Sequence, residues 1–553
     1  MMKKILLTLV CILAMAVSAV AEVKTVYVNP IRNDAGVDAV IAKRLYKKAL
    51  LGLTKAKTIA VSSGPSVITA GTPDATKYDF IMNLTIKEAP IVEAGTVGNL
   101  LGALSSSSKQ QPDWEGRLVT EIEVLHGPSA LEAFKTTREP RSTNKDKEMA
   151  LFNATNNFDY DMTDLTDDAF RVWGTVGEPF EVDKKNTVKS VRVDIGSKNG
   201  ARRNQMFEIF KVTGDKEEPV GFGKCEQVLN DSESVISING KKGADKVITE
   251  LIQNRDGSYN IEVYSRSKNS FLHSNFQGLD KMFTNEGRSH YLDPFGRSAK
   301  PTVAFLAVEI NDSKFASQKE NFQSAVVEGM ENVPTINLVR TVYPTVEAAG
   351  QAGVDGLIEI TVDKVFNTTG KTAEGKTKYE TEILYTLAGI DVAGNRWIDM
   401  KSYHGLGDSD ESYAKANADA LTLLDGNVQK FSEDVFPVAA KVLYPEEIKN
   451  NSAKKVRVNV GTDMGLKKGM NFDIYEQRSD GGADSRILLG EGKVEKDGLT
   501  PGEAILKIKG KNKGDEKLAT LLQNANDNIE IVAISKAGYD ILDKGLNFFN
   551  RTK

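Results

Sequence analysis

Cysteine, histidine and long apolar runs are scarce in this chain of 553 residues, and each shortage excludes a class of protein. Of its two cysteines, Cys11 lies in the N-terminal apolar run, so a disulfide framework is excluded and stability must come from packed cores. Its four histidines never stand at the spacing of a zinc site. The sequence therefore predicts no resident metal and no cofactor.

Motifs of catalysis and of nucleotide binding are also missing. The glycine-rich stretch 95–102 lacks the Lys-Ser/Thr pair of a phosphate-binding loop, and no G-x-S-x-G turn occurs. Cys225 lies within an alternating strand pattern, which predicts a buried, unreactive thiol. The formal net charge of -5 gives no basic surface for nucleic acid. We expect a protein that is not an enzyme and does not bind nucleic acid.

Residues 1–21 have the pattern of a secretory signal peptide. Lys3 and Lys4 precede an apolar run, and Ala19-Val20-Ala21 is a small-x-small cleavage site. The residues before Cys11 do not match a lipoprotein signal, so we expect an exported periplasmic protein without a lipid anchor. This leaves open a peripheral contact with the outer membrane. After the leader, no stretch is apolar enough to span a bilayer as a helix.

The rest of the chain is a duplication, which is clearest where residues 191–210 recur as 456–475 without a gap. Five positions match: Val191, Gly196, Gly200, Phe207 and Ile209 recur as Val456, Gly461, Gly465, Phe472 and Ile474. In each copy, alternating apolar residues break at Gly-x-x-x-Gly and then alternate again, which predicts two strands joined by a turn. Each copy therefore opens a small β module.

An α/β pattern precedes each β module. In the first half, strand candidates at 24–28, 78–86 and 118–125 accompany an amphipathic helix at 37–53 and a helix-biased segment at 145–173. The second half repeats the order with strands at 301–305, 354–362 and 379–387 and a helix at 313–330. Residues 266–300 and 536–553 have apolar residues at helical spacing and follow the two modules.

These patterns predict an α/β (α+β) fold: two tandem copies of a mixed-sheet α/β domain, each followed by a small antiparallel β module. The expected boundaries are 1–21 for the signal peptide, 22–185 and 186–265 for the first copy, 266–300 for a helical linker, 301–450 and 451–535 for the second copy, and 536–553 for a C-terminal amphipathic helix. Units of these lengths are within the usual range for domains.

Two motifs resemble known families. The helix candidate 345–352 leads through Gly353-Val354-Asp355 into a buried strand, which resembles the α/β domain of the CsgG-like family, of LpoB-type activators and of the TolB N-terminus. The spacing of glycines over 456–469 resembles the C-terminal β module of FlgT. The resemblance implies a non-enzymatic periplasmic protein that builds or operates an envelope assembly through contacts with other envelope proteins, and leaves self-association open.

Two surface features are candidates for docking a partner. The apolar, uncharged part of the insertion 91–108 carries Val97, Leu100, Leu101 and Leu104. The basic pairs Arg202-Arg203 and Lys467-Lys468 stand at the same turn of each β module, where an anionic partner could bind. A flexible loop and a solvated turn are the alternatives for these two features, and insertion of the loop into a membrane also stays open.

Two other functions stay open. Paired carboxylates of a glycan- or peptidoglycan-acting hydrolase can lie at any separation in a sequence. A component of an outer-membrane secretion channel would need membrane-inserting hairpins, for which the second half offers only the charged stretch 365–378.

Overall fold

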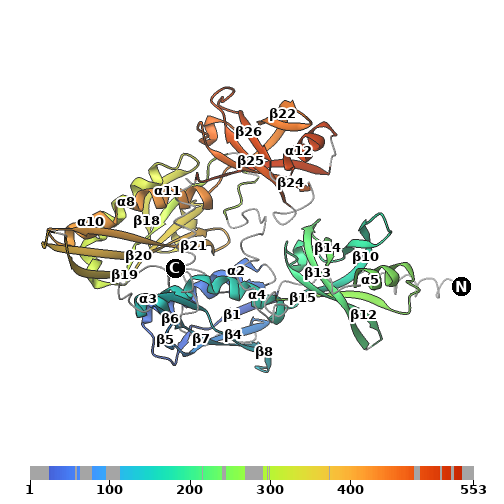
Figure 1. The fold of residues 1–553 in the computed structure, drawn as a ribbon, viewed down its shortest axis with the longest axis horizontal. Helices are drawn as coiled ribbons and strands as arrows, with labels where there is room; N and C mark the ends of the chain where they lie inside the picture. The colour runs from blue at the N-terminus through green and yellow to red at the C-terminus, as the bar shows by residue number, and fades with distance from the viewer. Residues whose placement is uncertain are drawn as a thin grey trace, which may run out of the picture.

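In the computed structural model, the chain folds into two α/β domains and two β-barrels, shown in Figure 1. The structure describes residues 24–56, 59–62, 77–94, 113–214, 216–239, 244–267, 291–295, 297, 299–372, 374–478, 486–510, 513–524 and 528–538. Among these residues, no helix has the length and apolarity that crossing a bilayer requires. The candidate signal peptide lies outside the described residues.

The first α/β domain is built on a mixed sheet with the strand order β3-β1-β4-β7-β8, and the short β2 pairs with β4. The strands are β1 (Lys24–Val28), β2 (Arg32–Asn33), β3 (Ile59–Val61), β4 (Phe80–Glu88), β7 (Val119–His126) and β8 (Glu132–Arg138). β1 is parallel to β3 and β4, whereas β7 is antiparallel to β4 and β8. Strict burial alternation in β4 and β7 shows that one face of the sheet lines the core.

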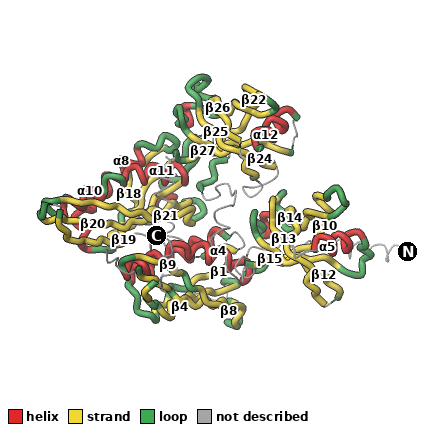
Figure 2. Tube along the Cα trace, viewed as in Figure 1, coloured by secondary structure: helices red, strands yellow, loops and turns green. Residues whose placement is uncertain are grey.

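Two helices, α2 (Ala39–Lys55) and α4 (Phe158–Ala169), cover that face. Asp38 begins α2 by accepting a hydrogen bond from the backbone N–H of Val40. The helices cross closely at Gly52, where a β-carbon would collide with the carbonyl oxygen of Asp159. Figure 2 shows these helices on the side of the first sheet that faces the second domain.

A small second sheet completes this domain, in the order β5 (Ile91–Glu93), β6 (Trp114–Arg117) and β9 (Arg141–Asn144). Helix α3 (Lys147–Ala154) packs on it, with Gly116 against the backbone of Ala150 and Leu151. A short 3-10 turn, η3 (Thr155–Asn157), connects α3 to α4.

The first barrel closes in the order β10-β11-β14-β13-β12-β15. Its strands are β10 (Trp173–Val182), β11 (Val188–Val193), β12 (Met206–Thr213), β13 (Lys216–Val228), β14 (Ser234–Asn239) and β15 (Asn260–Arg266). Helix α5 (Ala244–Gln253) lies between β14 and β15 in the chain. Closure depends on long-range antiparallel pairing of β15 with both β10 and β12.

The second half repeats both units. Its sheet has the order β18-β16-β19-β20-β21, with β17 on β19. The strands are β16 (Thr302–Leu306), β17 (Glu309–Ile310), β18 (Asn337–Tyr343), β19 (Gly356–Lys371), β20 (Thr377–Asp391) and β21 (Arg396–Ser409). The helical elements are η5 (Ser313–Gln318), α8 (Lys319–Glu331), α9 (Val346–Gln351), α10 (Tyr413–Ala420) and α11 (Leu424–Val435).

The second barrel closes in the same order as the first, β22-β23-β26-β25-β24-β27. The strands are β22 (Ala439–Lys449), β23 (Ser452–Val458), β24 (Asn471–Arg478), β25 (Ile487–Val494), β26 (Ala504–Gly510) and β27 (Ile529–Lys536), and helix α12 is Gly514–Gln523. In both barrels a 3-10 turn follows the second strand and ends at a glycine with positive φ, as η4 (Ser197–Asn199) ends at Gly200 and η6 (Thr462–Met464) at Gly465.

The two copies share individual hydrogen bonds as well as strand order. Asp79 accepts a backbone hydrogen bond from Thr25, and Asp355 accepts one from Thr302, at the same place in the two sheets. Ser265 exchanges two hydrogen bonds with the backbone of Val172, and Ser535 does the same with Val438. The predicted α/β fold, with mixed-sheet domains followed by antiparallel β modules, is confirmed.

The structure differs from the expected boundaries at the start of each barrel. We expected the β modules to begin at 186 and 451, but β10 and β22 already belong to the barrels. Each strand pairs with the last strand of its barrel, so that Trp173 lies opposite Tyr264 and Ala439 opposite Ile534. The expected linker helix and C-terminal helix lie largely outside the described residues.

Candidate functional site: one helix between two sheets

Helix α2 of the first domain lies between its own sheet and the sheet of the second domain (Figure 1). Leu45 and Leu50 of α2 belong to the same buried cluster as Trp397 and Met400 of β21. The two α/β domains thus share a core, in which a helix of the first copy covers a sheet face of the second.

The helix places its basic residues where the two domains meet. Lys43, Arg44, Lys47 and Lys48 repeat at the three- and four-residue spacing that keeps side chains on one helical face. Of these, Arg44 and Lys48 are buried. A buried charge is stable only when it is paired and hydrogen-bonded, so the partners of these residues define the site.

Arg44 has the largest set of partners. Its guanidinium donates to Asp363 of β19 at 3.2 Å, to Thr386 of β20 and to Ser402 of β21, all in the second domain. Within the first domain it donates to Thr155 and Asn156, at 2.8 Å in each case. Burial lowers the pKa of Arg44 and raises the pKa of Asp363, but an arginine stays charged at neutral pH. We therefore treat this pair as a charge-assisted hydrogen bond across the interface.

A second group of charges centres on Asp159 of α4, which is also buried. Lys48 lies 3.4 Å and Lys55 3.1 Å from the Asp159 carboxylate, and Lys55 also lies 3.4 Å from Asp399 of β21. Burial by itself raises the pKa of Asp159, but the two ammonium groups more than offset this and lower the pKa. Burial by itself lowers the pKa of Lys55, whereas Asp159 and Asp399 raise it overall.

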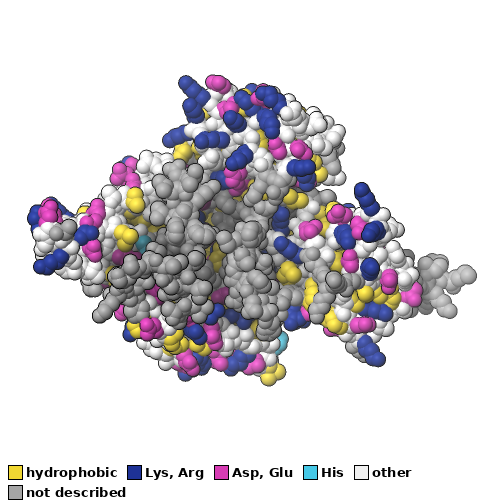
Figure 3. All heavy atoms as spheres, in the orientation of Figure 1, with side chains coloured by type: hydrophobic (Ala, Val, Ile, Leu, Met, Phe, Trp, Pro, Cys, Tyr) yellow, Lys and Arg dark blue, Asp and Glu magenta, His cyan; other side chains and the backbone are white. Residues whose placement is uncertain are grey.

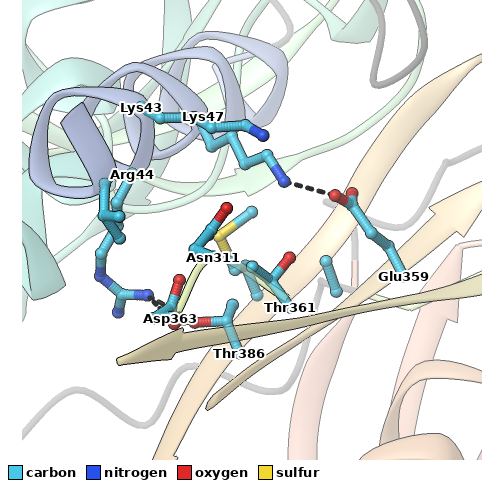
Figure 4. A pocket seen from close by; sticks show the side chains of 11 residues that line it. Lys43, Arg44, Lys47, Asn311, Glu359, Thr361, Asp363 and Thr386 are labelled. Atoms are coloured by element: carbon cyan, nitrogen blue, oxygen red, sulfur yellow. Dashed lines mark hydrogen bonds and ion pairs between the residues drawn. The ribbon is translucent and has the colours of Figure 1, made fainter. Parts of the chain in front are cut away.

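A third group lines a small cavity, shown in Figure 4. Lys47 pairs with Glu359, and Lys43 pairs with Glu309. The indole N–H of Trp397 donates to the other oxygen of Glu359 at 3.0 Å. The cavity has a volume of about 20 Å³, which is room for a water molecule and excludes a sugar or nucleotide.

Of the two corresponding helices α2 and α8 in the described parts of the chain, only α2 has a basic face. The glycine that corresponds to Gly52 is Gly329 of α8, where a β-carbon would collide with the carbonyl oxygen of Asp425 of α11. Counted from these glycines, Asn321 and Ser324 of α8 stand where Arg44 and Lys47 stand on α2. The second helix therefore lacks the basic face of the first.

The outer face of the first sheet also differs from its counterpart in the second. Glu121 of β7 pairs with Lys87 at 3.6 Å and with Lys135 at 3.3 Å, and Asn83 donates to Glu123 at 3.0 Å. Because these side chains pair with one another, this face of the first sheet can stay exposed to water. By contrast, Glu359 and Asp363 of the second sheet depend on cations from the first domain.

The basic residues that the sequence suggests for docking lie in different surroundings in the structure. Arg202 is largely buried and pairs with Asp167 of α4 at 2.6 Å, which joins the first barrel to its α/β domain. Arg203 donates to the backbone oxygen of Arg486 at 2.9 Å, which links the two barrels. Lys467 and Lys468, at the same turn of the second barrel, are exposed.

The candidate loop residues Val97, Leu100, Leu101 and Leu104 lie outside the described residues. The structure describes the strands on either side of that loop, where Ile91 of β5 lies opposite Gly116 of β6. The insertion therefore joins two antiparallel strands of the small sheet.

Sequence reasoning missed the basic face of α2 as a site, because charges on one side of an amphipathic helix usually face water. A signal was present at Glu359 and Asp363, which stand among the mostly apolar and buried residues at the start of β19. Two acids on one face of a buried strand require cationic partners, but the sequence does not say where those partners lie.

No protein-family model and no curated protein matches this chain. Among solved structures, the PelC dodecamer of Paraburkholderia phytofirmans matches at 15% identity over 24% of this chain and 88% of that chain, with a TM-score of 0.18. Lipoprotein GNA1162 of Neisseria meningitidis matches at 13% identity over 24% and 90%, with a TM-score of 0.17. TolB of Acinetobacter baumannii matches at 9% identity over 94% and 95%, with a TM-score of 0.15. These TM-scores are too low for the likeness to bear on the function of this chain.

Proposed function

We propose that this protein is a non-enzymatic scaffold of the bacterial periplasm, which supports an envelope assembly through contacts with other proteins. The observation that carries the proposal is the use of charge between the two α/β domains. Arg44, Lys47, Lys55 and their acidic partners hold one domain on the other, in a site with room for little more than water. The two α/β domains are thereby held in one arrangement, as a scaffold requires.

The alternative of a hydrolase finds less support in the described residues. Asp363 has a raised pKa and shares the cavity with Glu359, which superficially resembles a catalytic pair. However, the two acids are four residues apart on one strand, a separation of about 13 Å at the usual rise per residue. Each is also paired with a cation, and the cavity cannot admit a glycan.

The proposed location follows from the candidate signal peptide at residues 1–21. Peripheral association with the outer membrane and a secretion-channel role would require membrane contacts. Membrane fractionation of cells that express the full chain separates these possibilities, because a periplasmic scaffold is released with the soluble periplasmic proteins.

Site-specific photo-crosslinking tests the scaffold in its native host. A photoreactive residue replaces Lys468 on the exposed turn of the second barrel, and a matched control replaces Trp397 in the buried interface. We expect position 468 to capture defined envelope proteins and position 397 to give only links within the chain. Cytoplasmic retention of the protein, or hydrolysis of purified peptidoglycan by it, would contradict the proposal.

A further inference from the structure

The outside of the second barrel carries lysines at directly opposed positions on adjacent strands. Lys455 of β23 lies opposite Lys507 of β26, and Lys507 lies opposite Lys493 of β25. We call these three residues the lysine row. Their neighbours along the strands, such as Val456, Leu506 and Val494, are buried, so the row faces outward. Figure 3 shows Lys and Arg side chains gathered over this barrel, at the top of the view.

Such a row is unfavourable for folding. Neighbouring strands are about 4.8 Å apart, and like charges directly opposite one another destabilise a sheet. Lys455 is compensated by Glu495 at 2.7 Å and by Glu447, which lies opposite it on β22, at 4.0 Å. Among the described residues, no ion pair includes Lys493 or Lys507, and Glu447, which is near enough to attract Lys507, also pairs with Lys449 at 2.5 Å. The exposed Lys468 at the turn before β24 and the exposed Lys509 of β26 add positive charge.

The first barrel supplies a comparison within the same chain. Its pairing places Ser190 opposite Ser237, and Ser237 opposite Lys224, at the positions of the lysine row. The fold of the barrel therefore does not require lysines there. Two of the three lysines are specific to the second copy, and their cost in repulsion points to a role in binding.

We propose that the lysine row binds an extended acidic segment of a partner protein. Two geometric features favour a narrow, chain-like ligand over a membrane. Closing six strands into a barrel turns the surface by about 60° per strand, so a flat bilayer cannot meet all three lysines at once. Glu491 of β25 and Glu495, which directly follows β25, stand on either side of Lys493, and these carboxylates repel a broad anionic surface.

The chemistry of the row also favours an acidic polypeptide over nucleic acid. Lysine ammonium groups attract anions without the bidentate geometry by which arginine recognises phosphate. Single-stranded nucleic acid additionally needs aromatic side chains for base stacking, and the row consists of lysines alone. An acidic segment can lie across the strands and place successive carboxylates near successive ammonium groups. This inference names the class of partner that the proposed scaffold binds. It rests on the proposed function only for the cellular location in which the protein meets that partner.

Fluorescence anisotropy with a labelled oligoglutamate peptide tests the inference on the mature chain, residues 22–553. We expect salt-sensitive binding that weakens by about tenfold in the Lys455→Ser/Lys507→Ser variant, which copies the first barrel and can no longer form two exposed ion pairs with the peptide. The matched control, Lys184→Ser/Lys185→Ser, removes two exposed lysines from a turn of the first barrel and is expected to bind as the wild type does.

A charge-preserving variant guards against a folding artefact. Lys455→Arg/Lys507→Arg keeps both positive charges at the same opposed positions and is expected to bind the peptide as the wild type does. Peptide binding that is the same in all variants, or no binding at low salt, would overturn the inference. Binding of phosphatidylglycerol vesicles that the serine variant abolishes, without peptide binding, would assign the row to a membrane instead. None of these results bears on the location of the protein or on the proteins that are captured at position 468. The proposed function is therefore tested separately.

Discussion

Arg44 of α2 donates a hydrogen bond to Asp363 of β19, 319 residues further along the chain, and both side chains are almost completely buried. This bond joins the two copies of a duplicated α/β domain. Removing one partner of a buried pair leaves the other charge unpaired, whereas replacing both by apolar residues removes the problem. The pair therefore gives the first test of how the domains are held together.

We expect Arg44→Met to lower the free energy of unfolding by about 3–5 kcal/mol. The double variant Arg44→Met/Asp363→Leu should recover most of that loss, and urea denaturation of both variants measures the difference. Lys415→Met is the control, because its pair with Glu411 is exposed and its loss should change stability by no more than about 0.5 kcal/mol. A double variant that is as unstable as the single one would show that the ion pair is not the reason for the loss.

Gly52 and Gly329 should be equally intolerant of a side chain. Each lies where a helix meets the backbone of a second helix, and a β-carbon there would collide with a carbonyl oxygen. We expect Gly52→Ala and Gly329→Ala each to destabilise the protein by about 1–3 kcal/mol, the usual range for overpacking. Gly426→Ala in α11 has open space and should instead stabilise by about 0.5–1 kcal/mol. Thermal denaturation of the three variants measures these changes in stability. The same change in all three variants would contradict this account.

The Asp159 cluster predicts a specific loss of stability in acid. The pKa of Asp159 is lowered in the folded protein, so the ionised carboxylate contributes stability above its unfolded-state pKa of about 3.9. That contribution is lost as the pH falls through the folded-state pKa, because Lys48 and Lys55 then lose the Asp159 carboxylate as a partner. We expect Asp159→Asn to be less stable than the wild type at neutral pH and to lose less stability on acidification.

Denaturant midpoints measured across the acidic range test this prediction. Glu328→Gln, at an exposed position of α8, is the control and should follow the wild type. Parallel acid profiles for Asp159→Asn and the wild type would mean that Asp159 does not titrate with unfolding.

Cys225 is expected to be unreactive in the folded protein. Its side chain is fully buried in the first barrel, and its backbone N–H donates to Gln205 at 2.9 Å. A thiol-specific reagent should label a chain of residues 22–553 slowly in buffer and rapidly in urea, at a rate that follows unfolding of this barrel. Rapid labelling without denaturant would show that the first barrel opens readily.

The sequence predicted the architecture because the duplication doubled each signal. The repeated glycines at Gly196, Gly200, Gly461 and Gly465 located both barrels, and the alternation in β4 and β7 located a sheet. The starts of the barrels were missed because β10 alternates poorly, with Pro179 inside it and Phe180 and Val182 exposed. Its place is decided by pairing with β15, where Trp173 lies opposite Tyr264, and the local sequence pattern carries no information on a pairing so distant in the chain.

The candidate site was less predictable for the same reason. A basic helical face such as that of α2 has the same pattern whether it meets water or a second domain. Arg202 and Lys467 occupy the same turn in the two copies, yet Arg202 pairs with Asp167 and is largely covered, whereas Lys467 is exposed. The lysine row depends on strand register, which brings together residues that are separated in the sequence.

Zero-length carbodiimide crosslinking tests the central claim, that α2 of the first copy packs on the second sheet of the same chain. The reagent joins a lysine to a carboxylate only when they touch, and Lys43 with Glu309 and Lys364 with Glu148 are accessible pairs between the domains. In a mixture of isotopically light and heavy protein, we predict that mass spectrometry finds both links, each within chains of one isotope. Links between light and heavy chains, or no link between the two domains, would contradict the account.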